Sequence, residues 1–212
     1  TERASAFRER DALRAVAILL VLGAHMTYHP AWIRVGWTGV DLFFVLSGYL
    51  IAGLLFKEHR SAGRIQLGRF LIRRGFKIYP LYYAMVIATF AYYWHELTLQ
   101  KAWPDLFFAQ SYVMGYWHHF WSLAVEEQFY FILPVAFIAL AKFARPGREP
   151  FARLPLYCAA VAVAALALRI TSLITPEAAV FRIIKPGHLR MDALSFGVLL
   201  AYFEHYRPAA LR

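Results

Sequence analysis

The sequence predicts an all-α protein: a polytopic membrane bundle of about six transmembrane helices, with one further re-entrant or interfacial helix. Hydrophobic residues make up 60% of its 212 residues, and the mean hydropathy is +0.46. A soluble domain is nearer half apolar. The apolar residues also fall in blocks close to the ~20 residues that a helix needs to cross a bilayer. Basic residues gather between these blocks.

Six of the apolar blocks are long enough to cross a bilayer, and together they predict one membrane domain over residues 1–212. A seventh, residues 103–117, is too short for a full crossing, so we expect a re-entrant or interfacial helix on the outer side. The six expected spans are residues 12–28, 36–56, 76–94, 121–141, 155–174 and 189–205.

The distribution of lysine and arginine predicts that both termini are cytoplasmic and that the protein lies in the cytoplasmic (inner) membrane. Cytoplasmic loops carry the excess of basic residues, which explains the formal charge of +10 without a nucleic-acid partner. The alternate segments hold four lysines and arginines, whereas sixteen of the 23 lie in residues 1–10, 57–77, 142–153 and 207–212.

The sequence disfavours a cysteine-based framework and a cleaved signal peptide. The single cysteine, Cys158, lies in an apolar block, so neither a disulfide framework nor a thiolate metal cluster is available. The first apolar block follows a basic start, as a cleaved signal peptide would. However, Arg14 interrupts the block and no small-residue cleavage site follows it.

The first span carries two ionisable residues in "DALRAVAILLVLGAHMTYH". Arg14 and His25 are eleven residues apart, about three helical turns, so they share a helix face roughly 16 Å apart along the axis. Such groups inside a membrane commonly face a pathway or a site. Structural roles stay open, because Arg14 can snorkel to the interface and His25 can form a hydrogen bond between helices.

The second and third spans add an acid and a basic face. Asp41 is expected at a depth close to His25, where a carboxylate would orient the imidazole. Deeper in the second span, Ser47 and Gly48 favour close helix packing. Topology alone explains the basic residues before the third span, but guanidinium groups would also clamp a phosphate. These residues are Arg69, Arg73, Arg74 and Lys77.

The fourth span opens "HHFWSLAVEEQFYFILP", with Ser122 as the expected helix N-cap. Glu126 and Glu127 are adjacent and point about 100° apart, so at least one should face the protein interior or a wet cavity. In the sixth span, Arg190 and Asp192 would lessen the cost of burial as a pair. A zinc site from His25, His29, His118 and His119 is a further alternative. Because these histidines form no compact ligand motif, we expect no metal.

Five ordered segments resemble acyltransferase family 3, the integral-membrane O-acyltransferases similar to bacterial O-antigen and exopolysaccharide acetylases. The resemblance covers nearly the whole chain. It implies a helical bundle that takes an acyl group, in particular acetyl, from cytosolic acyl-CoA and passes it to a hydroxyl, usually of a saccharide. No permanently bound cofactor is expected. The segments are "RDALRAVAILLVLGAH", "GWTGVDLFFVLSGYLI", "RRGFKIYPLYY", "WSLAVEEQFYFILP" and "LRMDALSFG".

By position, the resemblance assigns roles to the residues above. Arg14 and the basic loop, which contains Arg73 and Arg74, would hold the phosphorylated end of acyl-CoA. His25 would act as general base or transient acyl carrier, and Glu126 or Glu127 would orient the acceptor or shuttle a proton. Further substrate-binding residues are expected to be Asp41, Arg69, Arg73, Arg74, Trp121, Ser122 and Arg190.

The chain departs from the family pattern at three points. Ala12 stands where glycine is frequent, and Lys77 where arginine is frequent. Family domains also continue for several more spans, so we expect a chain that is truncated or shortened at its C-terminus. A transporter that uses the buried charges as an ion or anion relay is the alternative function. No inverted repeat or pair of broken helices supports it.

Overall fold

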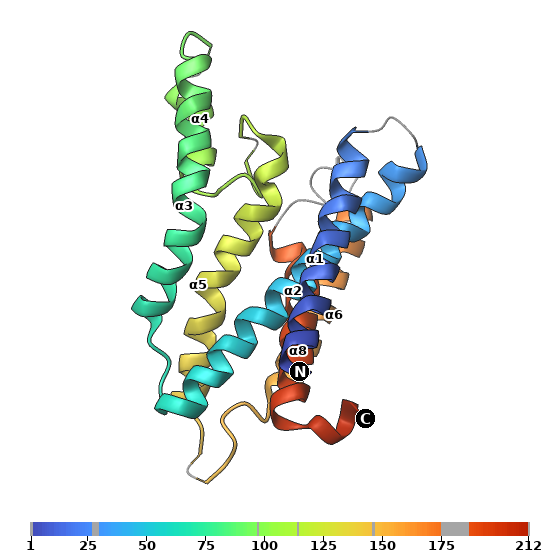
Figure 1. Cartoon of the computed structure of the whole chain (residues 1–212), viewed down its shortest axis with the longest axis vertical. Helices are drawn as coiled ribbons and strands as arrows, with labels where there is room; N and C mark the ends of the chain where they lie inside the picture. Colours follow the sequence, from blue (N-terminus) through green and yellow to red (C-terminus); the bar gives the residue numbers. More distant parts are fainter. Residues whose placement is uncertain are drawn as a thin grey trace. The chain divides into compact units, whose positions relative to one another are not determined.

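The structure is a computed structural model that describes residues 2–26, 30–96, 98–113, 115–145, 147–174 and 187–211. The all-α prediction is confirmed, since helices make up most of the described residues and these residues contain no strand. The helices are α1 (Glu2–Met26), α2 (Pro30–Ala62), α3 (Leu67–Tyr92), α4 (Leu99–Leu106), α5 (Trp121–Lys142), α6 (Leu154–Ile174) and α8 (Met191–Tyr206), with the 3₁₀ turns η1 (His118–Phe120), η2 (Gly187–Leu189) and η3 (Pro208–Leu211) (Figure 1).

Each expected span corresponds to one long helix, although α1, α2 and α3 begin six to ten residues before the expected spans. The helices are longer than the apolar blocks because polar residues continue them, as at the end of α2 and the start of α3. By length and hydropathy, three helices of the described residues qualify as membrane spans: Pro30–Ala62, Trp121–Lys142 and Leu154–Ser172. The chain is therefore a membrane protein, and the count of six spans stays a prediction.

The helix expected over residues 103–117 is not found. Its helical part is α4, eight residues long, and turns follow. Phe108 has a positive φ of 53°, the left-handed backbone that ends many helices. Instead of continuing a helix, the backbone N–H of Tyr116 donates to the Asp105 carboxylate at 2.7 Å. The position of this segment relative to the membrane stays a prediction.

The chain divides into two compact units. The α1–α8 unit comprises residues 1–54, 154–162 and 192–212. The α3–α5 unit comprises residues 55–153 and 163–191.

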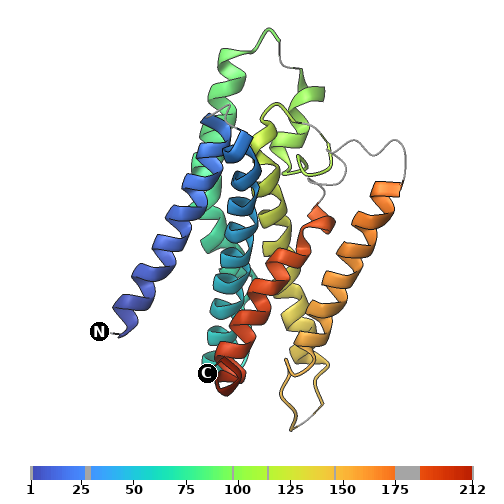
Figure 2. The same cartoon turned by 90° about the vertical axis from the view of Figure 1, so that its right-hand side faces the viewer.

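Small residues allow close backbone contact inside the α1–α8 unit. Helices α1 and α2 are neighbours (Figure 2), and a Cβ atom on Gly39 would lie only 2.7 Å from the Ala17 carbonyl oxygen. A Cβ on Gly48 would overlap the Leu194 carbonyl of α8, and one on Gly197 would overlap the Val45 carbonyl of α2. The close packing expected at Gly48 is thus confirmed.

Aromatic side chains fill the α3–α5 unit. The Tyr82 ring of α3 stacks on Phe108 with 4.4 Å between ring centroids, and Val86 and Ala124 complete this buried cluster. Helix α3 contacts both α4 and α5, and Figure 1 shows α3 beside α5. The hydroxyl of Tyr82 donates to the Asp105 carbonyl at 2.5 Å, which ties α4 to α3.

The predicted topology can be tested with single cysteines in a Cys158→Ser background. Cysteines at Arg60 and Arg148 should resist an impermeant thiol reagent on intact cells, because both lie in segments expected to be cytoplasmic. A cysteine at Lys101 should react. All three side chains are exposed, so permeabilised cells provide the positive control. Position 148 is preferable to 147, where Gly147 has a φ of 77° that disfavours a side chain. Labelling of position 148 from outside would refute the six-span topology.

Candidate active site between α3 and α5

Two adjacent carboxyl groups lie inside the α3–α5 unit. Glu126 and Glu127 are each 4% exposed, so both face the interior, where at least one was expected. Burying a carboxylate is costly unless donors compensate it. The surrounding side chains of α3 and α5 supply such donors.

Tyr79 of α3 is the partner of Glu127, and its hydroxyl donates to Oε1. Gly75, one turn earlier, makes this contact possible. A Cβ at Gly75 would lie 2.9 Å from the Tyr79 ring, so the ring extends across a position that has no side chain. Sequence reasoning missed Tyr79. Its one signal was the spacing of glycine and tyrosine, four residues apart, in "RRGFKIYP".

Glu126 has a different set of partners. The Tyr130 hydroxyl, one turn along α5, donates to its Oε2 at 3.2 Å. The Arg74 guanidinium lies over the Tyr130 ring, 5.2 Å from its centroid, and its charge also attracts Glu127. Arg74 thus joins two parts of the chain, the basic segment of α3 (residues 69–77) and the glutamate segment of α5 (residues 126–130). Arg73, by contrast, is exposed, as is Arg69.

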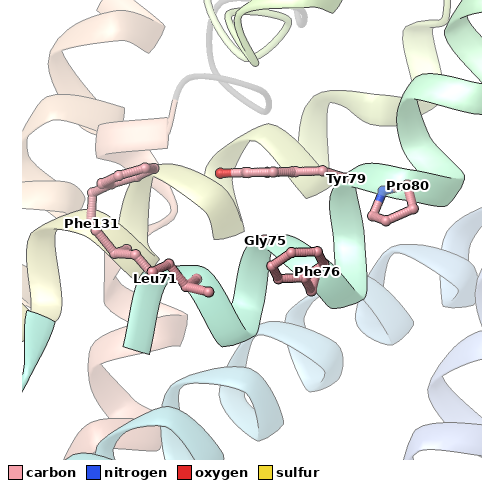
Figure 3. A pocket seen from close by; sticks show the side chains of 7 residues that line it. Leu71, Gly75, Phe76, Tyr79, Pro80 and Phe131 are labelled. Atoms are coloured by element: carbon pink, nitrogen blue, oxygen red, sulfur yellow. The ribbon is translucent and has the colours of Figure 1, made fainter. Parts of the chain in front are cut away.

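An apolar cavity of about 400 Å³ lies beside this cluster. The Tyr79 ring forms one wall, with Phe131 of α5 and side chains of the first half of α3 around it (Figure 3). The lining residues are Leu71, Ile72, Gly75, Phe76, Tyr79, Pro80 and Phe131. The hydroxyl of Tyr79 is engaged with Glu127, so the cavity suits an apolar chain.

The first turn of α5 meets the η2 turn. The Arg190 guanidinium lies 5.9 Å from the centroid of the Trp121 ring, a distance suited to a cation–π contact. Two expected substrate-binding residues are therefore neighbours. Gln128 secures the preceding loop, since its amide donates to the Phe108 carbonyl at 3.2 Å and to Ser111 Oγ at 3.0 Å.

Ser122 is not the N-cap of α5. The helix begins at Trp121, and Phe120 occupies the cap position without a side-chain hydrogen bond. The reason is the 3₁₀ turn His118–Phe120, which leads directly into the helix and leaves Ser122 inside the first turn. Ser122 is half-buried there.

Arg14 and His25 lie in the α1–α8 unit on one uninterrupted helix, as their spacing predicts. The His25 side chain is exposed, and its Nδ1 contacts the Val21 carbonyl at 2.7 Å. Because a carbonyl only accepts, this contact assigns the proton to Nδ1. In the neutral ring, the lone pair is then on Nε2.

The register between α1 and α2 does not support Asp41 as the residue that orients His25. Gly36 of α2 packs against Ala24 of α1, and Gly39 packs against Ala17 and Leu20. Because α1 and α2 run antiparallel, this pairing places Asp41 beside positions 18 and 19 of α1. At 1.5 Å per residue it is about 10 Å from the level of His25. Asp41 is half-buried there.

Among the described residues, no three His, Cys, Asp or Glu side chains gather closely enough to hold a metal ion. His29, one of the histidines weighed as a zinc ligand, lies outside those residues.

Residues 8–175 match a protein family described as an acyltransferase domain. Four of the five quoted segments lie within this match, and "LRMDALSFG" lies beyond it. No solved structure matches the chain.

Several curated relatives are named O-acetyltransferases. Peptidoglycan O-acetyltransferase OatA of Listeria monocytogenes is 33% identical over 155 residues, covering 64% of this chain and 25% of the relative. A putative O-acetyltransferase of Staphylococcus aureus strain COL is 36% identical over 149 residues, covering 61% and 24%. O-acetyltransferase OatA of S. aureus strain NCTC 8325 is 34% identical over 156 residues, covering 64% and 25%. The chain spans about a quarter of the length of these relatives.

Proposed function

The chain belongs to acyltransferase family 3, and from this premise we propose that it transfers an acyl group from cytosolic acyl-CoA to a hydroxyl of a cell-envelope saccharide. The family match over residues 8–175 carries the proposal. The relatives' names favour acetyl as the acyl group and a cell-envelope polymer as the acceptor. The protein would work as a multi-pass protein of the cytoplasmic membrane, with the bilayer, acyl-CoA and the saccharide as its partners.

The donor would bind through its phosphates on the cytoplasmic side. Arg69 and Arg73 are exposed on α3, and guanidinium groups bind phosphate through paired donors. Arg14 would add a third cation from α1. Arg74 has another role in this proposal, because its guanidinium lies over Tyr130 and its charge attracts Glu127.

His25 would act as general base on the acceptor hydroxyl. In that role Nε2 takes the hydroxyl proton as the new C–O ester bond forms. The C–S bond of the thioester breaks, and the CoA thiolate is protonated as it leaves. A transient acyl group on His25 is the other route. One of the two glutamates would orient the acceptor, and the buried carboxyl groups beside Tyr79 and Tyr130 support this role.

Acyl transfer can be separated from transport with purified protein. Incubation with acetyl-CoA and a soluble peptidoglycan oligosaccharide should release free CoA thiol and yield an acetylated oligosaccharide. Reactions without the protein, and reactions with protein that was heated before the assay, serve as controls. Anion flux into liposomes without thiol release would instead support the transporter alternative.

Arg73→Ala should raise KM for acetyl-CoA about tenfold and change kcat little, because a phosphate contact made in both ground and transition states contributes mainly to binding. Steady-state kinetics measure both constants. Arg64→Ala is the matched control, since Arg64 is an exposed basic residue just before α3, the helix that carries Arg73, and has no proposed role. If basic residues here serve topology alone, the two variants should behave alike.

His25→Ala should lower kcat by roughly 10²–10⁴-fold, the contribution typical of a general base. Its abundance and thermal stability should stay near normal, because the side chain is exposed. His25→Gln provides a second variant of similar polarity. Abundance and acetyl transfer should be measured together. Normal turnover with reduced abundance would show that His25 is structural.

A further inference from the structure

We propose that Tyr79 is a positioning residue for Glu127, so that the Oε2 oxygen of Glu127 receives the hydrogen bond of the acceptor hydroxyl. This inference rests on the proposed acyl transfer and deepens it in two ways. It selects Glu127 over Glu126 as the carboxylate that orients the acceptor. It also adds a residue of α3 to the site.

The two oxygens of Glu127 have different surroundings. Oε1 accepts a hydrogen bond from the Tyr79 hydroxyl, whereas Oε2 is buried and has no hydrogen-bond partner among the described residues. The side chain as a whole is 4% exposed. Buried polar atoms are nearly always hydrogen-bonded, so such an atom calls for an explanation. A substrate hydroxyl has the donor that Oε2 lacks.

The geometry of α3 fixes Tyr79 in this role. Its ring forms a wall of the α3–α5 cavity (Figure 3) and passes over Gly75, where a Cβ would lie 2.9 Å from the ring. The Tyr79 ring therefore lies between the cavity and the α3 backbone, and its hydroxyl contacts Glu127. A tyrosine ring has few rotatable bonds, so this arrangement fixes the carboxyl group at little entropic cost.

Glu126 is the less suitable carboxylate. Its Oε2 accepts from the Tyr130 hydroxyl of its own helix at 3.2 Å, and the Tyr130 ring lies under Arg74. Glu126 therefore belongs to a set of contacts that joins α5 to the basic segment. Glu127 is instead held from the neighbouring helix, by the Tyr79 hydroxyl of α3.

Tyr79→Phe tests the proposal, because it removes the hydroxyl and keeps the ring over Gly75 and beside the cavity. We expect kcat/KM for the peptidoglycan oligosaccharide to fall about 10–100-fold, the loss typical of a misplaced reacting group. KM for acetyl-CoA should change little, whereas the melting temperature should fall, because Oε1 of the buried Glu127 loses its described donor.

Tyr82→Phe is the matched control. The Tyr82 hydroxyl lies one turn along α3, where it donates to the Asp105 carbonyl and accepts from Gln110, with no described contact to either glutamate. Its loss should lower the melting temperature and leave the kinetic constants near those of the wild type. A merely structural Tyr79 would behave like Tyr82.

A double-mutant cycle shows whether Tyr79 acts through Glu127. Glu127→Gln replaces one carboxylate oxygen by an amide donor and should itself reduce transfer strongly. Adding Tyr79→Phe should then cause little further loss, since coupled residues are non-additive. Independent, multiplying losses would overturn the inference while acyl transfer stands. No transfer by the wild-type protein would overturn the proposed function and this inference with it.

Discussion

Two carboxyl groups buried side by side between apolar helices impose the constraint on which the rest of the site depends. A carboxylate inside a membrane protein is retained only with compensating donors. Glu126 and Glu127 obtain theirs from Tyr130 of α5 and Tyr79 of α3, and Arg74 adds a positive charge beside both helices. These contacts hold the basic segment of α3 against the glutamate segment of α5.

Glycines make both units possible, each in its own way. In the α1–α8 unit, Gly48 and Gly197 bring two helix backbones into contact, the packing that small residues allow where lipid offers no hydrophobic gain. In the α3–α5 unit, Gly75 instead makes room for an aromatic ring of its own helix. The first use determines how helices cross, and the second directs the hydroxyl of Tyr79 to Glu127.

The basic segment combines two kinds of arginine that look alike in the sequence. Arg73 is exposed, as the proposed phosphate contact requires. Arg74 is half-buried and directed toward α5. Neighbouring positions of a helix point about 100° apart, so one side chain is exposed and the other lies against the protein. One dipeptide thereby serves the proposed donor site and the packing of the carboxyl groups.

The sequence by itself determined the helical class, the positions of the long helices and the Arg14–His25 register, because apolar blocks and helical periodicity are local properties. It did not determine the end of α4 at Leu106, where a left-handed Phe108 stops the helix, or the start of α5 at Trp121 after a 3₁₀ turn. Only the tertiary structure shows that Arg73 is exposed while Arg74 is half-buried. It also shows that Asp41 lies away from the level of His25 and that Tyr79 contacts Glu127. Those relations depend on how one helix is placed against another, and the pattern along a single helix carries no record of its neighbour.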